Sequence, residues 1–162
     1  AKRPHFWLSW DFAQLYLRFS VIISRHGYNR LAVFGRQEKM MLKIKRAYEQ
    51  AETTDGRRIL IDRLWPRGLS KAEAHIDIWL KELAPSTELR QWFGHDPQKW
   101  AEFRKRYMEE LSSPEKTRLI EDIARHAKHH DITLVYGAKD TEHANIKVLE
   151  EVIHKNAAAA KV

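Results

Sequence analysis

The sequence predicts an α/β fold in which helices cover a small, mainly parallel sheet. Residues 42–48 alternate apolar and polar side chains, which is the pattern of a half-buried strand. Residues 58–62 and 132–136 are mainly apolar runs, which are typical of strands covered on both faces. The stretches between and after these strands have helical periodicity, and strands joined by helical stretches favour a parallel sheet.

Turn and cap residues divide the rest of the chain. Residues 53–56 have the composition of a turn. Ser70 and Glu73 have the spacing of a capping box, and apolar residues at positions 76, 79, 80 and 83 predict that this helix continues to residue 83 with Trp79 in the core. Four later helix starts are expected from capping or proline signals: Ser86, Asp96-Pro97, Ser113-Pro114, and Asp140 or Thr141.

Charge and cysteine content limit the classes of protein to which the chain can belong. The formal net charge is +7, but residues 1–40 hold seven basic and two acidic residues, whereas the rest holds 22 basic and 20 acidic residues. Nucleic-acid binding by counterion release needs clustered cations, and the body of the chain is nearly balanced. The chain has no cysteine, which excludes disulfides and thiolate chemistry and suits a cytoplasmic protein.

Residues 1–40 differ in character from the rest of the chain. Residues 6–23 are apolar and aromatic, but Asp11 and Arg18 interrupt them, which argues against a membrane-spanning helix and against a signal peptide. Met40 and Met41 stand directly before the first strand. We interpret residues 1–40 as an extension that is translated from upstream or derived from cloning. The alternatives are an added helix on the domain and a membrane-surface anchor.

Two polar loops are expected to meet at one edge of the sheet. In parallel sheets, ligands bind beyond the carboxyl ends of the strands. If the two buried strands are neighbours, residues 62–68 and 139–143 lie at the same edge. The domain proper is expected to span residues 41–155, and the alanine-rich tail 156–162 is expected to fray.

Several strings in the chain carry a family resemblance. They are DRLWPRGLS at residues 62–70, WLKELAPS at 79–86 and WFGHDP at 92–97. Together with Tyr136, the pair Lys139-Asp140 and His143, they resemble the YeaO-like family, bacterial proteins with a domain of unknown function numbered 488. The resemblance covers residues 41–155 and implies a small cytoplasmic α/β protein, but it implies no activity. The chain departs from the family pattern at Ala144, where the family often has Asn; here Asn145 comes one position later.

The two loops supply candidate ligand-binding residues. Arginine binds carboxylate or phosphate through two parallel hydrogen bonds, and a lysine adds positive charge. Trp65 could stack on a ligand ring, and either arginine of the loop could instead form a structural pair with Asp62 or Asp140. The residues expected to bind the ligand are Arg63, Arg67, Lys139, Trp65 and Tyr136.

Acidic and imidazole groups supply candidate proton chemistry. A histidine oriented by a carboxylate can act as general acid or base. The candidates are His143, Asp140, His95 and Asp62, although Asp140 and Asp96 could serve only as helix caps. His126, His129 and His130 could ligate a metal or simply meet a helix dipole. No phosphate loop, dinucleotide glycine fingerprint or HExxH motif is present, and we expect neither a metal nor a cofactor.

Three functional hypotheses follow. The first is an anion-binding pocket at the carboxyl ends of the strands, in an enzyme or a ligand sensor. The second is a nucleic-acid-binding or regulatory protein that uses residues 1–40 and the run Arg104-Lys105-Arg106, which neighbouring glutamates weaken. The third is a protein-interaction module without chemistry. No membrane partner is expected.

Overall fold

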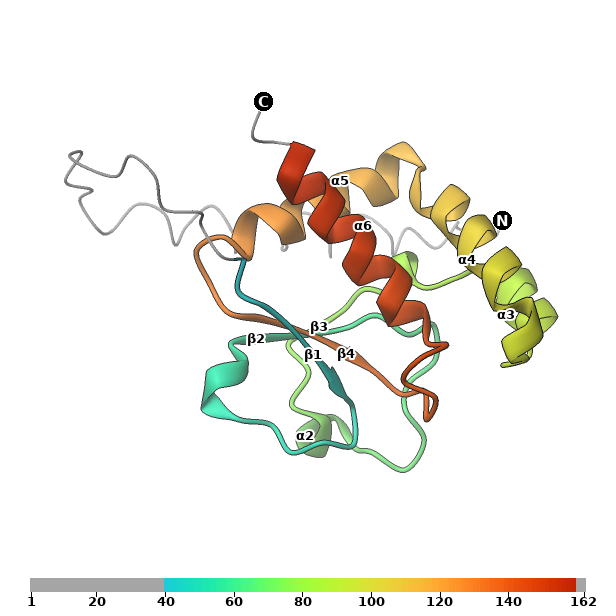
Figure 1. Cartoon of the computed structure of the whole chain (residues 1–162). Coiled ribbons are helices and arrows are strands. Elements are labelled where there is room, and N and C mark those ends of the chain that lie inside the picture. The colour runs from blue at the N-terminus through green and yellow to red at the C-terminus, as the bar shows by residue number, and fades with distance from the viewer. Residues whose placement is uncertain (1–39, 160–162) are drawn as a thin grey trace, which may run out of the picture. The chain divides into compact units, whose positions relative to one another are not determined.

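The computed structural model describes residues 40–159. Four strands form one sheet in the order β1-β4-β2-β3, and every neighbouring pair is parallel, which confirms the predicted α/β class (Figure 1). The strands are β1 (Leu42–Arg46), β2 (Arg57–Leu60), β3 (Ile78–Trp79) and β4 (Ile132–Tyr136). β2 and β4 are neighbours, so their carboxyl ends share one edge.

Helices lie on both faces of the sheet. The larger helices lie on one face and the short α2 lies on the other (Figure 1). The helices are α2 (Lys71–Ala74), α3 (Thr87–Phe93), α4 (Trp100–Leu111), α5 (Pro114–His126) and α6 (Asn145–Ala159). Three 3-10 turns add Thr53–Asp55, Lys81–Leu83 and Pro97–Lys99.

The sheet separates two apolar cores. β4 is buried along its whole length, as its composition predicts. Its residues Ile132, Leu134 and Tyr136 face the core formed with the larger helices, whereas Val135 packs with Ala47 and Leu60 on the opposite face. This alternation fixes the direction in which each side chain leaves the end of its strand.

The predicted capping residues act largely as expected. The Ser70 hydroxyl accepts the backbone N–H of Glu73, and the Glu73 carboxylate accepts the N–H of Ser70, which completes the capping box. The Ser86 hydroxyl caps α3 through the N–H of Leu89. The Asp96 carboxylate accepts the N–H of Gln98 at the turn before α4.

The helix predicted for residues 70–83 is wrong beyond Ala74. α2 ends there, and Ile78 and Trp79 instead form the edge strand β3, with the Trp79 side chain 40% exposed rather than in the core. Asp77 explains the difference, because its carboxylate accepts the N–H of Arg58 at 2.8 Å and its own N–H donates to the Arg58 carbonyl at 3.0 Å. These bonds attach the segment to the open edge of β2.

The last helix also differs from the expectation. α6 begins at Asn145, so neither Asp140 nor Thr141 caps it. At its other end it continues to Ala159, past the boundary expected at residue 155. The proposals for residues 1–39 and for residues 160–162 lie outside the described residues. Among residues 40–159, no helix is long and apolar enough to cross a membrane.

Gly56→Ala is expected to lower the free energy of unfolding by at least about 1–3 kcal/mol, the usual cost of holding a non-glycine residue in a disfavoured conformation. Gly56 has φ of 61° and ψ of −132°, and a Cβ there would lie 2.0 Å from the backbone oxygen of Asp131. Gly68→Ala is the control, because its φ of 78° carries similar strain but nothing lies within 4 Å of a Cβ there. Denaturant unfolding of both variants should show the larger loss for Gly56→Ala, and equal losses would contradict the steric argument.

Candidate functional site

The loops that follow β2 and β4 meet at the carboxyl edge of the sheet. The backbone N–H of Gly137 donates to Oδ2 of Asp62 at 2.7 Å, which joins residues 75 positions apart in sequence. A Cβ at position 137 would lie 3.1 Å from the same carboxylate oxygen, so a glycine allows this close approach. The expectation that these two loops share an edge is therefore confirmed.

Asp62 is a largely buried carboxyl at this edge. Burial raises its pKa above the ordinary value, and hydrogen bonds from the Gly137 N–H and the Asn145 side chain oppose that shift, as does a charge on His95. Asn145 is the first residue of α6. Its side-chain amide, one position after Ala144, hydrogen-bonds to the Asp62 carboxyl. A carboxyl held this way can exchange a proton or accept a hydrogen bond from a ligand.

His95 has a strained backbone beside the aromatic core. Its φ is 59°, directly after Gly94 at 53°, and few non-glycine residues adopt such values. Its exposed ring lies 5.8 Å from the ring of Phe93, between centroids. Strained residues often accompany function, and His95 also lies near enough to Asp62 to influence its pKa.

Asp140 and His143 form a closed turn before α6. Nδ1 of His143 lies 2.8 Å from Oδ2 of Asp140, and Oδ1 accepts the backbone N–H groups of Glu142 and His143. The backbone and side-chain hydrogen bonds from His143 lower the pKa of Asp140, so this carboxylate stays charged. The His143 ring also makes a T-shaped contact with the ring of Trp100, with 5.4 Å between the centroids. The carboxylate therefore fixes the orientation of the imidazole.

Tyr136 is the last residue of β4 and faces several charges. Burial raises the pKa of its hydroxyl, Arg46 lowers it, and Glu49, Asp62 and Glu142 raise it. Because Arg46 pairs with Tyr136 in register across β1 and β4, both side chains leave the same face of the sheet. The tyrosine thus lies between Arg46 and Asp62.

Arg46 is a site residue that sequence reasoning missed. Its Nε donates to the carbonyl of Ala138 at 2.9 Å, and its guanidinium lies 5.5 Å from the ring centre of Tyr48. The Tyr48 hydroxyl in turn donates to the carbonyl of Arg67 at 3.1 Å. Its position in the sequence could have identified it. Arg46 is the last residue of β1, and all strands of a parallel sheet end at the same edge. We call the group Arg46, Asp62, His95, Tyr136, His143 and Asn145 the carboxyl-edge site.

The other predicted ligand-binding residues lie in different surroundings. Arg67 and Lys139 are exposed on loops adjoining this site. Trp65 packs with Leu60 and Val135 on the face of the sheet away from the larger helices. Its Nε1 donates to the Leu69 carbonyl at 2.7 Å, and its ring lies 5.5 Å from that of Trp79, between centroids. Arg63 donates through Nε to the Pro85 carbonyl at 2.9 Å. No contact among residues 40–159 joins Arg63 to Lys139.

Two further features lie away from this edge. Among the described residues, no group of three or more His, Asp or Glu side chains could hold a metal ion, and Nδ1 of His126 lies 2.7 Å from the Asp122 carbonyl oxygen.

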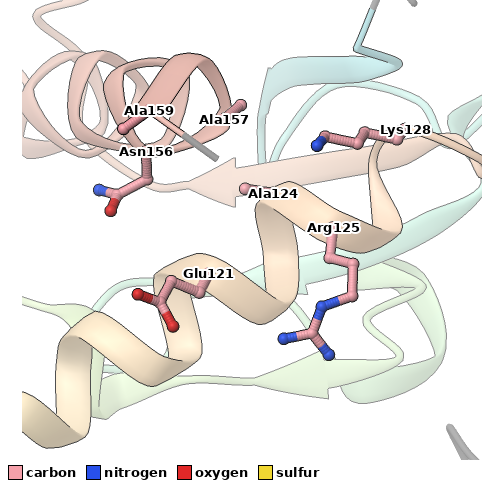
Figure 2. A pocket seen from close by; sticks show the side chains of 7 residues that line it. All are labelled: Glu121, Ala124, Arg125, Lys128, Asn156, Ala157 and Ala159. Atoms are coloured by element: carbon pink, nitrogen blue, oxygen red, sulfur yellow. The ribbon is translucent and has the colours of Figure 1, made fainter. Parts of the chain in front are cut away.

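An open hollow of about 490 Å³ lies between the carboxyl-terminal ends of α5 and α6. It is lined by Glu121, Ala124, Arg125, Lys128, Asn156, Ala157 and Ala159 (Figure 2). Since α6 starts at the carboxyl edge, the hollow lies at the opposite end of that helix.

Comparison with known proteins identifies the family. Residues 41–161 match the family model described as "Inactive DUF488-N3 subclade". The uncharacterised protein YeaO of Escherichia coli is 43% identical over 113 residues, which cover 69% of this chain and 96% of that protein. An uncharacterised protein of Mycobacterium tuberculosis is 46% identical over 70 residues, which cover 43% of this chain and 59% of that protein. No solved structure matches. The chain therefore belongs to the inactive DUF488-N3 subclade, within the YeaO-like proteins.

Proposed function

We propose that this protein binds a small anionic ligand at the carboxyl-edge site and acts as a ligand sensor. The main support is the hydrogen bond between Gly137 and Asp62, which joins the two loops that carry most of the candidate residues. The description of the family as inactive favours binding over turnover. The absence of cysteine agrees with a cytoplasmic location for such a sensor.

Positive charge and hydrogen-bonding groups have separate roles in this proposal. Arg46 supplies a partly buried guanidinium, and Arg67 and Lys139 add charge at the exposed rim. A guanidinium can bind a carboxylate or phosphate through two parallel hydrogen bonds, and it stays charged when partly desolvated. The Tyr136 hydroxyl and the His143 ring, oriented by Asp140, would contact the remaining polar groups of the ligand.

The nucleic-acid alternative has weaker support. Arg104 pairs with Glu151 on α6, and Arg106 pairs with Glu102 one turn away and lies 4.4 Å from the ring centre of Trp92. Two of the three cations of this basic run are thus neutralised by carboxylates. Such pairing reduces the net charge available for phosphate contacts.

The interaction-module alternative has one observation in its favour. Leu64 and Trp79 are 59% and 40% exposed, and Trp79 belongs to the edge strand β3. Exposed apolar residues beside an open strand edge suit contact with another protein. Leu64→Ser would be expected to weaken such contact without changing binding of a small anion.

Arg46→Gln is expected to weaken ligand binding at least about tenfold, or about 1.4 kcal/mol. A thermal-denaturation screen of nucleotides, sugar phosphates and carboxylates should reveal one ligand that stabilises the wild-type chain, by about 2.7 kcal/mol at 100 times its dissociation constant. Titration of that ligand then gives the affinity of each variant. The loss follows because the guanidinium would be the least solvated cation of the site.

Arg125→Gln is the matched control for this substitution. Arg125 lies on α5 and lines the hollow at the end of α6 opposite the proposed site, and its exposed guanidinium pairs with Asp122 at 3.0 Å. The control should bind the ligand as the wild type does. The proposed function would be refuted if no compound in the screen stabilised the wild type. It would also be refuted if Arg46→Gln bound the ligand with the same affinity as the wild type.

A further inference from the structure

A second group of charged side chains surrounds the start of α3. Its first member, Arg63, follows Asp62 directly in sequence, but the two side chains bind different partners. Asp62 bonds to Gly137, whereas Arg63 reaches the Pro85 carbonyl, directly before the Ser86 cap of α3. Arg63 therefore belongs to surroundings different from those of the carboxyl-edge site.

Short contacts connect Arg63 with Lys116 through the residues between them. The backbone N–H of Ser86, next to Pro85, donates to Oε2 of Glu110 at 2.8 Å. Nζ of Lys116 lies 3.8 Å from the same oxygen. The group thus takes its members from the loop after β2, the end of α4 and the first turn of α5. We call Arg63, Glu110 and Lys116 the α3-start cluster.

The charges of the α3-start cluster do not balance. The cluster holds two cations and one carboxylate, Glu110, which contacts Lys116 at 3.8 Å and accepts the Ser86 N–H at the shorter distance of 2.8 Å. Among the described residues, the only hydrogen bond of Arg63 uses Nε, which leaves its two terminal nitrogens available to a ligand. The cluster therefore carries unpaired donors and net positive charge.

Partial burial makes this imbalance costly to the unliganded protein. The Lys116 side chain is only 20% exposed, and Arg63 is half-buried. Burial lowers the pKa of Lys116 and the nearby Arg63 charge lowers it further, while Glu110 acts in the opposite direction. Two like charges in a poorly solvated place are stabilised by an anion that both can contact.

We propose that Arg63 and Lys116 bind a phosphoryl group at the α3-start cluster, separately from the ligand of the carboxyl-edge site. A doubly charged oxyanion would be contacted by both terminal nitrogens of the Arg63 guanidinium and by the Lys116 ammonium. It would compensate the two cations more completely than the single carboxylate of Glu110 does. A singly charged carboxylate ligand would offset less of the charge and is expected to bind more weakly.

Titration of the full chain with inorganic phosphate tests this site. At constant ionic strength, phosphate is expected to raise the thermal midpoint in a saturable way, and acetate is expected to do so less. Lys116→Gln should weaken phosphate binding at least about tenfold, because it removes one of two cations. NMR of the Lys116 side chain gives a second readout: its pKa should rise when phosphate binds, which a purely structural lysine would not show.

Two matched variants separate this site from the carboxyl-edge site. Arg63→Gln should lose phosphate binding as Lys116→Gln does, whereas Arg67→Gln, four residues along the same loop, should retain it. Loss of phosphate binding in Arg67→Gln with retention in Lys116→Gln would overturn the proposal and assign the phosphate to the carboxyl edge. Absence of any saturable response, or an unchanged Lys116 pKa, would also overturn it.

Discussion

Asp55→Asn is expected to lower the free energy of unfolding by about 3–5 kcal/mol, the cost of breaking a buried ion pair by removing one partner. Asp55 is 1% exposed and its carboxylate contacts Nη1 of Arg58 at 2.5 Å and Nζ of Lys45 at 2.6 Å. Arg58 is itself only 3% exposed, so a neutral residue at position 55 would leave a buried guanidinium without its counter-charge. Urea unfolding monitored by circular dichroism measures the loss.

Asp62→Asn is the matched control, because the same substitution removes a charge from the opposite environment. Burial raises the pKa of Asp62, which means that its charged form destabilises the fold at neutral pH. Asparagine can still accept the Gly137 N–H. The control is therefore expected to equal or exceed wild-type stability at pH 7. Similar losses in both variants would contradict the assignment of Asp55 as a buried ion-pair partner.

The two aspartates should also respond oppositely to pH. Burial raises the pKa of Asp55, but hydrogen bonds from Lys45, the Glu52 backbone and Arg58 outweigh it, so the pKa lies below the ordinary 3.8. Its stabilising contribution is complete above pH 3.8 and is lost as the pH falls through the folded value. The pKa of Asp62 is raised, so its contribution is present below pH 3.8 and is lost as the pH rises through its folded value.

Local sequence patterns predicted most of the fold, but they misplaced the segment after Ala74 and the start of the last helix. β4, the capping box at Ser70 and the start of α3 could be read because alternation, apolar runs and cap residues act over a few positions. The segment containing Ile78 and Trp79 has helical spacing, yet it pairs with β2. That outcome depends on an open strand edge some 20 residues earlier, which local periodicity does not contain.

The candidate site shows the same limit at the level of single side chains. The sequence predicted that the loops after β2 and β4 meet, because that follows from strand order. It did not predict which way each side chain leaves its loop, so Arg63 was grouped with Lys139 although its bond goes to Pro85. Arg46, at the end of β1, is instead the arginine that contacts the loop of Lys139, through the Ala138 carbonyl.

Phe103→Ala is expected to lower the free energy of unfolding by about 3–5 kcal/mol, the range for deleting a buried aromatic ring. Phe103 is 2% exposed and its ring stacks on Phe93 at 4.3 Å and on Trp100 at 5.6 Å between centroids. The cavity would open under Trp100, whose edge meets His143. Leu64→Ala, at a side chain that is 59% exposed, should change stability by no more than about 0.5 kcal/mol.

The same substitution tests whether the aromatic core positions the histidine of the carboxyl-edge site. Trp100 contacts both Phe103 and His143, so its displacement should change the NMR shift of the His143 ring. Phe103→Leu refills most of the cavity and should restore both stability and the ring shift in large part. A stability loss in Phe103→Ala with an unchanged His143 resonance would show that the bond to Asp140 alone holds the imidazole. A joint change would mean that the core of α4 sets the geometry of the turn before α6.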